Sequence, residues 1–492
     1  MHLLAITASI AVVSAQSAWK IGQGVKTTSG TIHGKASSWK PDVSEYLGVP
    51  FARPPVGALR WQMPLPLDQP NAVVNATQYS NSCAESASRP SRKDPKSPQN
   101  VGASEGPQSE DCLYLNIWTK PQTGDKKKAV LAWIFGGGFV VGSANNSPYV
   151  GAQLADEQDV ILVSINYRLG VLGFPGVALP EKNPGLLDQR KAIEWIRDNI
   201  EGFGGDPKRI TVFGQSAGGA SADFMAYAYT EDPIVNAFIP QSGTASMAEN
   251  VARKPEVALN HWSQLSTKLG CGNVTAATVS SNLVCLQEKS VDQVLDATEG
   301  IGGTSQVGVW GPKYDDKTVM SDIADRRKKG NFVKRPILVG NVNNEAGLKT
   351  NTSASRQNMF GCPAGMAAKA RRDAGVPAWR YLYQAEWPNN QLYSDPVKAA
   401  QVHGAWHGSE LALLFGTTER KGKGPDTPAE KVLARKMRDA WAAFAKDPDH
   451  GLEKLGWPLY DPAKPTVVVL GGPNDATIKF ESPSEIDKGC SA

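Results

Sequence analysis

Short apolar runs rich in β-branched residues alternate along this sequence with longer amphipathic segments, and that alternation restricts the fold more than any other feature. Between two of the runs, residues 186–203 carry apolar side chains near helical spacing, and Gly204 then ends the segment. Strand, helix and strand in this rhythm predict an α/β fold, in which crossover helices flank a large, mostly parallel central sheet. The runs typical of buried parallel strands are 129–135, 160–167, 209–214, 237–243 and 336–340.

The composition is that of a large globular protein. Of the 492 residues, 41% are hydrophobic and 20% are charged, which provides enough apolar surface for a core and too little charge for a disordered chain. The net charge is only +4, so there is no electrostatic basis for a nucleic-acid partner. Because we find no internal repeat and no linker-like tract, we expect residues 16–492 to form one domain.

The first fifteen residues have the pattern of a secretory signal peptide. They form a short apolar run that ends in small residues, with Val13 and Ala15 in the positions that precede a cleavage site. The alternative is a buried N-terminal strand or helix. No later stretch has the roughly 20 apolar residues of a membrane helix, and there is no C-terminal hydrophobic tail for a lipid anchor. We therefore predict removal of residues 1–15 and a secreted, extracellular protein without a membrane span.

The six cysteines predict disulfides, because thiols of an exported chain are oxidised. No two of them have CxxC spacing, so we expect no metal or redox role. Their spacing favours two local pairs and one pair that fastens the C-terminal tail: Cys83–Cys112, Cys271–Cys285 and Cys362–Cys490. Four N-x-S/T sequons predict a glycosylated surface, at Asn75, Asn145, Asn273 and Asn351.

A pentapeptide after one predicted strand has the pattern of a nucleophile elbow. The residues 214–218, GQSAG, follow the run RITVF and precede small residues suited to the start of a helix. Such a turn holds its serine in strained backbone geometry, and the flanking glycines keep the turn free of side-chain clashes. Ser216 Oγ would project above the sheet, near the positive end of the following helix. We therefore predict that Ser216 is a nucleophile for acyl transfer.

An acyl-transfer nucleophile also needs hydrogen-bond donors for the oxyanion that forms. The glycine-rich loop FGGGF at residues 135–139 follows an earlier predicted strand. By itself this loop would be an ordinary turn, but its combination with the elbow favours an oxyanion hole. We expect the backbone N–H groups of Gly137 and Gly138 to bind the oxyanion, together with that of Ala217.

A histidine base and an acid complete such a site, in the chain order Ser, Asp or Glu, His. Glu345 fits the acid because it lies just beyond a predicted strand, whereas no strong strand precedes Asp315 or Asp316. His403 and His407 are four residues apart, the spacing of a metal-binding pair on a helix. Such a pair is disfavoured, because the adjacent glycines oppose a helix and no glutamate follows His403 as the HExxH motif requires. The histidines that remain as candidates for the base are His403, His407 and His450.

Long segments carry more specific patterns: YLGVPFARPPVGALRW, SEDCLYLNIW, NPGLLDQ and FGQSAGG occupy residues 46–61, 109–118, 183–189 and 213–219. Together with the GFGGDP stretch at 202–207, they resemble the type B carboxylesterases, the cholinesterase-like branch of the α/β-hydrolases. The resemblance covers nearly the whole mature chain, and secreted fungal members are the most similar in overall pattern. It implies a single catalytic domain with the α/β-hydrolase fold, and the pairs Cys83–Cys112 and Cys271–Cys285 match the family's usual disulfides.

By the same resemblance, Glu345 in NNEAG is the acid of the triad, and His407 in HGSEL is the base rather than His403. Ser242 in QSG resembles the family's serine that hydrogen-bonds the acid carboxylate. The implied reaction is hydrolysis of a small-molecule carboxylic ester through an acyl-enzyme, with no metal and no organic cofactor.

Three departures from the family's patterns restrict the substrate. Gln215 is neutral where cholinesterases have Glu, and residues 84–111 contain no aromatic side chain for a choline site. Val101 is the only large apolar residue of that loop, which in lipases of the family is an amphipathic lid. Gly308 aligns with an aromatic that narrows the acyl pocket in cholinesterases. We therefore expect soluble esters of short-to-medium or small aromatic acids, with Gln215, Gly308 and Trp310 in the substrate pocket.

Two other functions fit less well. A lipase acting on acylglycerols is disfavoured by the polar loop at 84–111. A cholinesterase-like adhesion or binding protein without catalysis is disfavoured because such relatives typically lack the nucleophile, whereas Ser216, Glu345 and His407 are all present here.

Overall fold

The computed structural model describes residues 19–86, 102–121, 127–177, 179, 181–247, 255–303, 307–346, 357–393, 402–421 and 424–490. Three features predicted from the sequence lie outside these residues. They are the signal peptide at 1–15, the sequon at Asn351, and residues 87–101 of the loop that contains Val101.

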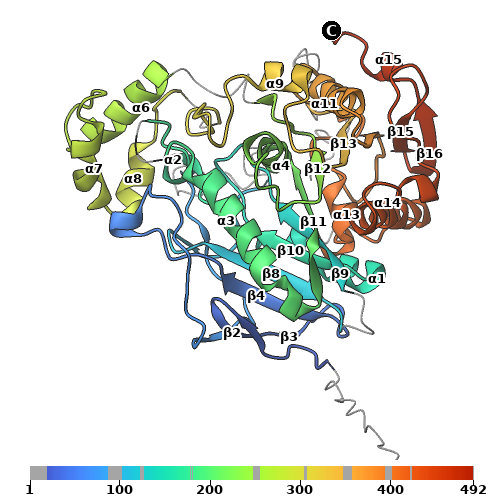
Figure 1. Cartoon of the computed structure of the whole chain (residues 1–492), viewed down its shortest axis with the longest axis horizontal. Coiled ribbons are helices and arrows are strands. Elements are labelled where there is room, and N and C mark those ends of the chain that lie inside the picture. The colour runs from blue at the N-terminus through green and yellow to red at the C-terminus, as the bar shows by residue number, and fades with distance from the viewer. Residues whose placement is uncertain are drawn as a thin grey trace, which may run out of the picture.

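An eleven-stranded sheet forms the centre of the described part of the chain (Figure 1). Its strands lie in the order β16-β15-β14-β13-β12-β11-β9-β10-β8-β4-β3. Strands β9 to β15 are parallel to one another, and antiparallel strands complete both edges. The bounds are β3 (Lys35–Ala36), β4 (Ser44–Pro50), β8 (Tyr114–Thr119), β9 (Lys128–Ile134), β10 (Ile161–Ile165), β11 (Gly205–Gln215), β12 (Ala237–Gln241), β13 (Ile337–Val342), β14 (Ala378–Tyr383), β15 (Val467–Gly472) and β16 (Asp475–Glu481).

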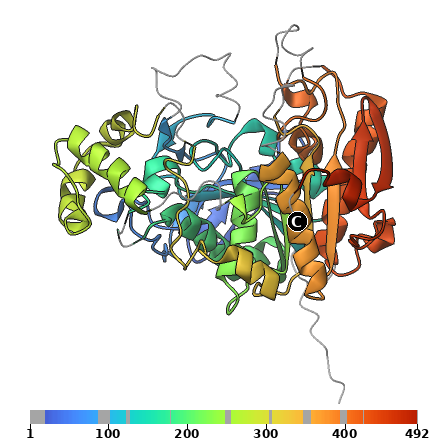
Figure 2. The ribbon, with the colours of Figure 1, turned by 90° about the horizontal axis from the view of Figure 1, so that it is seen from above.

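The burial of the parallel strands explains their composition. Every residue of β9, β10, β12, β13, β14 and β15 is buried, so these strands are apolar on both faces. Helices cover the sheet on both sides (Figure 2), and the predicted α/β fold with a mostly parallel sheet is confirmed. The helices that pack on the sheet are α1 (Ala152–Gln158), α3 (Pro184–Asn199), α4 (Ala217–Ala228), α11 (Cys362–Asp373) and α14 (Pro428–Lys446).

A helical lobe beside the sheet has its own hydrophobic core (Figure 1). The lobe consists of α6 (Pro255–Lys268), α7 (Val279–Gln287) and α8 (Val291–Ala297). We call the cluster inside it the second core; its largest members are Trp61, Trp262 and Trp310. Arg60 fastens the lobe to the N-terminal region, because its guanidinium donates hydrogen bonds to the carbonyl oxygens of Leu286 and Lys289.

Smaller elements complete the fold. Two further sheets are formed by β1 (Val25–Thr27), β2 (Gly30–His33) and β5 (Val73–Asn75), and by β6 (Ser82–Cys83) with β7 (Gln108–Ser109). The short helices are α2 (Gly170–Gly173), α9 (Ile323–Lys329), α13 (Leu411–Phe415) and α15 (Pro483–Ile486), and the 3₁₀ turns include η5 (Ser147–Tyr149) and η8 (Glu419–Lys421).

Three disulfides cross-link the described part of the chain. They are Cys83–Cys112, Cys271–Cys285 and Cys362–Cys490, the pairs expected from the spacing. The last of them ties the start of α11 to the C-terminal tail. A partly buried ion pair between Arg380 and Asp487 reinforces the same attachment.

The sequon at Asn145 is incompatible with a glycan in the folded protein. The Asn145 side chain is buried, and its Nδ2 donates a hydrogen bond to the carbonyl oxygen of Ser80 at 2.9 Å. Its Oδ1 accepts a hydrogen bond from Asn116. A glycan on Asn145 Nδ2 would break this polar network, so the folded structure disfavours glycosylation at Asn145. Asn75 and Asn273 are exposed.

Removing the Cys271–Cys285 disulfide should destabilise the protein less than removing Cys362–Cys490. The two pairs are separated by 14 and 128 residues, and a longer closed loop restricts the unfolded chain more strongly. We expect losses of about 3 and about 5 kcal/mol for the two double Cys→Ser variants. Urea unfolding at equilibrium measures both values, and a larger loss for the local pair would contradict this account.

Candidate active site

Ser216 lies in a strained turn between β11 and α4. Its backbone has φ 58° and ψ −121°, a conformation that non-glycine residues rarely adopt. A Cβ atom on Gly218 would lie 2.0 Å from the carbonyl oxygen of Ile134, so only glycine fits beside the neighbouring strand. The backbone N–H of Ser216 donates to the carbonyl of Gln241 on β12 at 2.8 Å, which holds the turn against the sheet. These features are those of the predicted nucleophile elbow.

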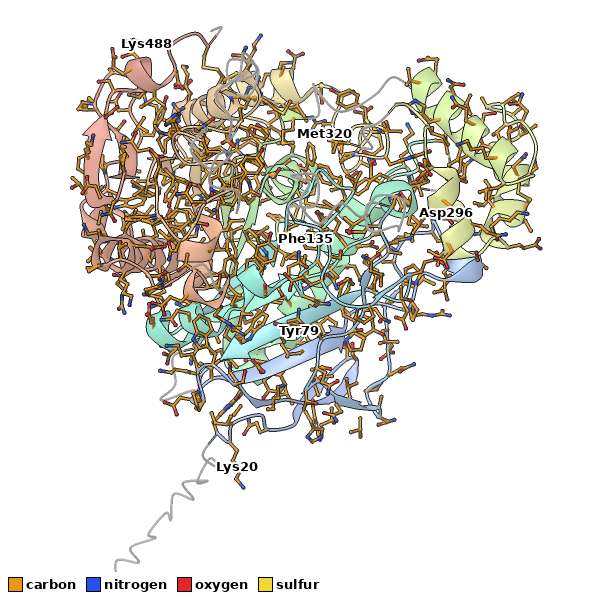
Figure 3. All side chains as sticks on the ribbon, turned by 180° about the vertical axis from the view of Figure 1, so that it is seen from behind. Lys20, Tyr79, Phe135, Asp296, Met320 and Lys488 are labelled. Atoms are coloured by element: carbon orange, nitrogen blue, oxygen red, sulfur yellow. A yellow bond between two sulfur atoms is a disulfide. The ribbon has the colours of Figure 1, made fainter. Side chains whose placement is uncertain are left out.

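The glycine loop after β9 approaches this turn closely. A Cβ atom on Gly136 would lie 2.9 Å from the Cβ of Ser216, and Gly137 and Gly138 have φ values of +119° and +62°. Phe135 anchors the start of the loop, because its ring stacks on Tyr167 with centroids 4.4 Å apart. Figure 3 shows Phe135 near the centre of the molecule.

Three backbone donors near Ser216 are unused. No described residue accepts a hydrogen bond from the N–H groups of Gly137, Gly138 or Ala217. The first two belong to the glycine loop, and the third is the first residue of α4. Ala217 is buried, and Gly137 and Gly138 are partly exposed. Backbone donors that are left without a partner beside a nucleophile suit a negatively charged oxygen of a bound reactant.

Glu345 and His407 are brought together from separate segments. Glu345 Oε2 makes a hydrogen bond with His407 Nδ1, and Glu345 Oε1 accepts one from the backbone N–H of Val342 at 3.1 Å. The Asn344 N–H donates to the carbonyl of Ala405 at 3.1 Å, which fixes the two loops to each other. The carboxylate is almost fully buried, whereas the His407 side chain keeps 24% of its surface exposed.

The other candidate acids and bases do not take part in this pair. His403 is exposed, and only its carbonyl oxygen contacts this region, where it accepts a hydrogen bond from Asn344. His450 lies on the surface 3.0 Å from Glu453. Asp315 and Asp316 accept hydrogen bonds from backbone N–H groups of their own turn.

Ser242 does not make the hydrogen bond expected from the resemblance. Its Oγ is buried and has no hydrogen-bond partner in the described part of the structure. Its backbone, at φ 45°, donates instead to the carbonyl of Gly340 at 2.8 Å. Both carboxylate oxygens of Glu345 already accept hydrogen bonds, from Val342 and His407. The expected hydrogen bond between Ser242 and the acid carboxylate is therefore not made in this structure.

His407 Nε2 faces Gln215 rather than Ser216. The Nε2 atoms of His407 and Gln215 lie 3.1 Å apart. Ser216 Oγ makes no hydrogen bond with any residue that the structure describes. Catalytic hydrogen bonds are often long or misaligned without substrate, so this geometry is compatible with a Ser–His pair.

The predicted substrate pocket is only partly as expected. Trp310 is 1% exposed and belongs to the second core, where its ring lies 6.2 Å from that of His261, so solvent and ligands do not reach it. Gly308 has φ +79° and directly follows Val307, which is half exposed. A Cβ atom on Gly138 would lie 2.9 Å from Val307 Cγ2, which places Val307 beside the oxyanion loop.

The sequence reasoning missed two residues near the site, Val307 and Phe360. The Phe360 ring packs on that of His407, with centroids 4.7 Å apart, and it is almost fully buried. Neither residue belongs to a catalytic motif. The only available signal for Val307 was its position next to Gly308.

A second buried carboxyl group, Glu410, lies three residues after His407. It is fully buried, and its Oε1 accepts a hydrogen bond from Gln241 Nε2 at 3.3 Å. Gln241 Oε1 in turn accepts one from Trp441 at 3.1 Å. Burial raises the pKa of Glu410 to about 7, and the nearby negative charge of Glu345 adds to this effect.

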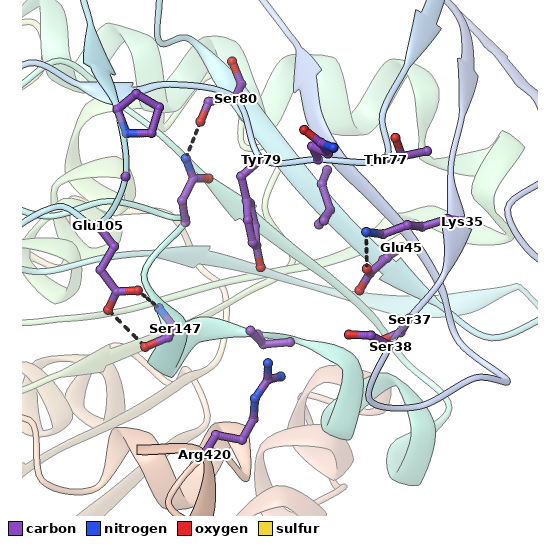
Figure 4. Close-up of a pocket in the computed structure, with 16 residues that line it drawn as sticks. Lys35, Ser37, Ser38, Glu45, Thr77, Tyr79, Ser80, Glu105, Ser147 and Arg420 are labelled. Carbon is purple, nitrogen blue, oxygen red and sulfur yellow. Dashed lines mark hydrogen bonds and ion pairs between the residues drawn. The ribbon is translucent and has the colours of Figure 1, made fainter. Parts of the chain in front are cut away.

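One cavity lies away from these residues. It has a volume of about 530 Å³ and a lining that is polar and apolar in about equal parts (Figure 4). Lys35, Glu45 and Tyr79 line one part, and Glu105 and Arg420 line another. None of the predicted catalytic or oxyanion residues lines it. Among the described residues, no group of histidines, cysteines and carboxylates could hold a metal ion, and no helix is long and apolar enough to cross a membrane.

Comparison with known proteins gives consistent matches. The family model described as "Carboxylesterase family" matches residues 22–359 and 349–484. A chlorogenic acid esterase of Aspergillus niger is 35% identical over 452 residues, which cover 88% of this chain and 85% of that protein. Secreted lipase 5 of Gibberella zeae is 31% identical, with 94% and 93% covered. A solved structure of a PNB esterase has a TM-score of 0.77 and 27% identity, and the match covers 95% of this chain and 99% of that one.

Replacing Glu410 with Gln should make stability less dependent on pH. The unfolded chain ionises this carboxyl near pH 4.5, but the folded chain keeps the proton until about pH 7. The wild type therefore loses about 3 kcal/mol of stability as the pH rises through that window. The Gln variant does not lose this stability, because its amide does not ionise. The free energy of unfolding, measured with urea, should be higher for the variant relative to the wild type at pH 8 than at pH 5.

The exposed Glu288 provides a matched control for this comparison. Glu288→Gln should change stability equally at both pH values. An equal change for Glu410→Gln would show that burial of Glu410 does not oppose its ionisation.

Proposed function

The chain belongs to the carboxylesterase family, has the α/β-hydrolase fold and is a carboxylic ester hydrolase, and from this premise we propose that Ser216, His407 and Glu345 form its catalytic triad. The observation that carries the proposal is the hydrogen bond between Glu345 Oε2 and His407 Nδ1. It joins an acid after β13 to a histidine whose other nitrogen faces the β11–α4 turn. Ser216 is the strained nucleophile candidate in that turn.

In this mechanism the ester carbonyl is attacked by Ser216 Oγ while His407 Nε2 takes the hydroxyl proton. Glu345 accepts the Nδ1–H, which keeps the ring in the reactive tautomer and stabilises the imidazolium. The imidazolium then protonates the departing alcohol. Water, activated by the same histidine, hydrolyses the acyl-enzyme and restores Ser216.

The unused N–H groups of Gly137, Gly138 and Ala217 form the proposed oxyanion hole. Each donor of this kind contributes about 3 kcal/mol to transition-state stabilisation. The proposal is supported by the close approach of the glycine loop to Ser216 and by the positive φ values that only glycine adopts easily.

For the substrate, we propose soluble esters of short-to-medium or small aromatic acids. Gly308 adds no side chain to the acyl side of the site, and half-exposed Val307 beside Gly138 is small enough to leave that side open. One relative is named a chlorogenic acid esterase. Another relative is named a lipase, which keeps acylglycerol hydrolysis as the alternative to be tested.

We also propose that residues 1–15 are a signal peptide and that residues 16–492 form one extracellular catalytic domain. The three disulfides support an oxidising compartment, and one of the relatives is a secreted protein. Asn75 and Asn273 are the exposed sequons available for glycans.

Ser216→Ala should leave a folded protein whose esterase turnover falls by about 10⁴–10⁶-fold, because no other group can form the acyl-enzyme. His407→Ala should have a comparable effect, whereas His403→Ala serves as a matched control with little effect. Turnover of a p-nitrophenyl ester measures all three. If His403→Ala abolished turnover and His407→Ala did not, the assignment of the base would be wrong.

The rate on a short-chain ester should rise hyperbolically with concentration and show no jump at its solubility limit. Interfacial activation needs a lid with several large apolar side chains, each worth about 1.5–3 kcal/mol on burial, and the loop at 84–111 has only Val101. Emulsified long-chain triglyceride should be hydrolysed far more slowly than dissolved esters. Triglyceride turnover equal to that of soluble esters would establish the lipase alternative instead.

A further inference from the structure

The side chain of Gln215 occupies the position that the triad mechanism requires for Ser216. Its Nε2 lies 3.1 Å from His407 Nε2, which is the nitrogen that must receive the serine proton. Gln215 is the last residue of β11, and its side chain is 5% exposed. The contact is therefore a buried hydrogen bond between Gln215, the residue before the proposed nucleophile, and the proposed base His407.

The direction of this hydrogen bond follows from the other side of the ring. His407 Nδ1 faces the carboxylate of Glu345, which only accepts hydrogen bonds when it is ionised. Nδ1 then carries the ring proton, and Nε2 has a free lone pair. The group that Gln215 presents to Nε2 must be its amide N–H, which donates to that lone pair.

A glycine of the oxyanion loop makes room for the amide, because a Cβ atom on Gly136 would lie 2.8 Å from Gln215 Oε1. On the other side, Gly408 of the loop that carries His407 lies next to the amide, where a Cβ atom would be in ordinary contact at 3.6 Å from Gln215 Nε2. The Gln215 side chain is thus held between the oxyanion loop and the loop that carries His407. It connects the nucleophile turn, the oxyanion loop and the base at a single point.

On the basis of the triad proposed above, we infer that Gln215 is a positioning residue that occupies His407 Nε2 in the free enzyme and releases it to Ser216 when an ester binds. Its N–H bond stabilises the neutral imidazole and orients the ring. The Ser216 hydroxyl replaces that bond in the enzyme–substrate complex. Gln215 itself exchanges no proton with the substrate.

Other ionisable groups lie near His407, and a test of Gln215 must leave these groups the same in every variant. Glu345 contacts the ring directly, and Glu410 lies at the start of α13. Burial raises the pKa of Tyr381 on β14, and the charges of the nearby Glu410 and Glu345 add to this effect. Substitutions at Gln215 change none of these groups.

The inference predicts different pH profiles for the free enzyme and the substrate complex. Gln215→Met keeps the length of the side chain but removes the donor, so protonation of His407 becomes easier in the free enzyme. The acid limb of kcat/KM should move to higher pH by about one unit or less, the effect of one neutral hydrogen bond. The acid limb of the saturated acylation rate should not move, because the complex no longer contains that bond.

Gln215→Glu should shift the pH profile of kcat/KM in the same direction as Gln215→Met, but further. An ionised carboxylate cannot donate and attracts the imidazolium, so the acid limb of kcat/KM should move further than in the Met variant. Gln287→Met is the matched control, because Gln287 bonds backbone carbonyls of Ala58 and Arg60 instead of the base. It should leave both profiles unchanged.

The experiment uses single-turnover acylation of the full-length protein by a p-nitrophenyl ester from pH 4 to pH 9. Active sites are counted with an organophosphonate, which normalises each variant for its folded fraction. The pH midpoint of the acid limb of kcat/KM should increase from the wild type to the Met variant and again to the Glu variant. The pH midpoint of the acylation rate at saturating substrate should be the same for all three proteins. If the Met variant does not fold, the Glu variant carries the test.

Two results would overturn the inference. A Met or Glu variant with the wild-type kcat/KM midpoint would show that Gln215 does not engage the base. Equal shifts of the pH midpoint in kcat/KM and in the saturated acylation rate would show that Gln215 stays bonded to His407 when the ester binds. A wild type that reacts with no organophosphonate at Ser216 would overturn the proposed triad, which is a separate outcome.

Discussion

The close approach of backbone segments at the carboxyl edge of the parallel sheet is the constraint on which the site depends. Glycine is required there because a Cβ on Gly218 would collide with Ile134, and one on Gly243 would lie 2.0 Å from the carbonyl oxygen of Ser216. This packing holds Ser216 at positive φ. It also brings the glycine loop after β9 within van der Waals distance of the turn around Ser216, so the proposed oxyanion donors are already in place before a reaction.

The base and acid are positioned by a different kind of contact. Glu345 and His407 lie on loops, and their alignment depends on the backbone hydrogen bond from Asn344 to Ala405 and on the buried hydrogen bond between the two side chains. Phe360 covers one face of the ring. The nucleophile is thus fixed by strands, whereas the base is held by loop pairing, which leaves the side of His407 Nε2 free to change its partner.

Several parts of this arrangement were predictable from short segments. The elbow around Ser216 and the glycine loop both follow strands, because the local pattern already contains the residues that permit each turn. Ser242 does not bond the acid and Trp310 lies in the second core, because a motif gives a position in the chain but not the direction of a side chain. Asn145 shows the same limit, because its sequon says nothing of the polar network that buries its amide.

The sequence by itself predicted the α/β fold and the three disulfide pairs, because these follow from local periodicity and from the spacing of the cysteines. Its local patterns also gave the hypotheses of the elbow and the glycine loop, and the family resemblance gave the residues of the proposed triad. Only the tertiary structure decided which partner His407 Nε2 meets, where Val307 and Phe360 lie, and that Glu410 is buried beside Glu345. Those contacts join residues from loops and strands far apart in the chain. Their distances depend on how the layers pack, and no local pattern in the sequence encodes them.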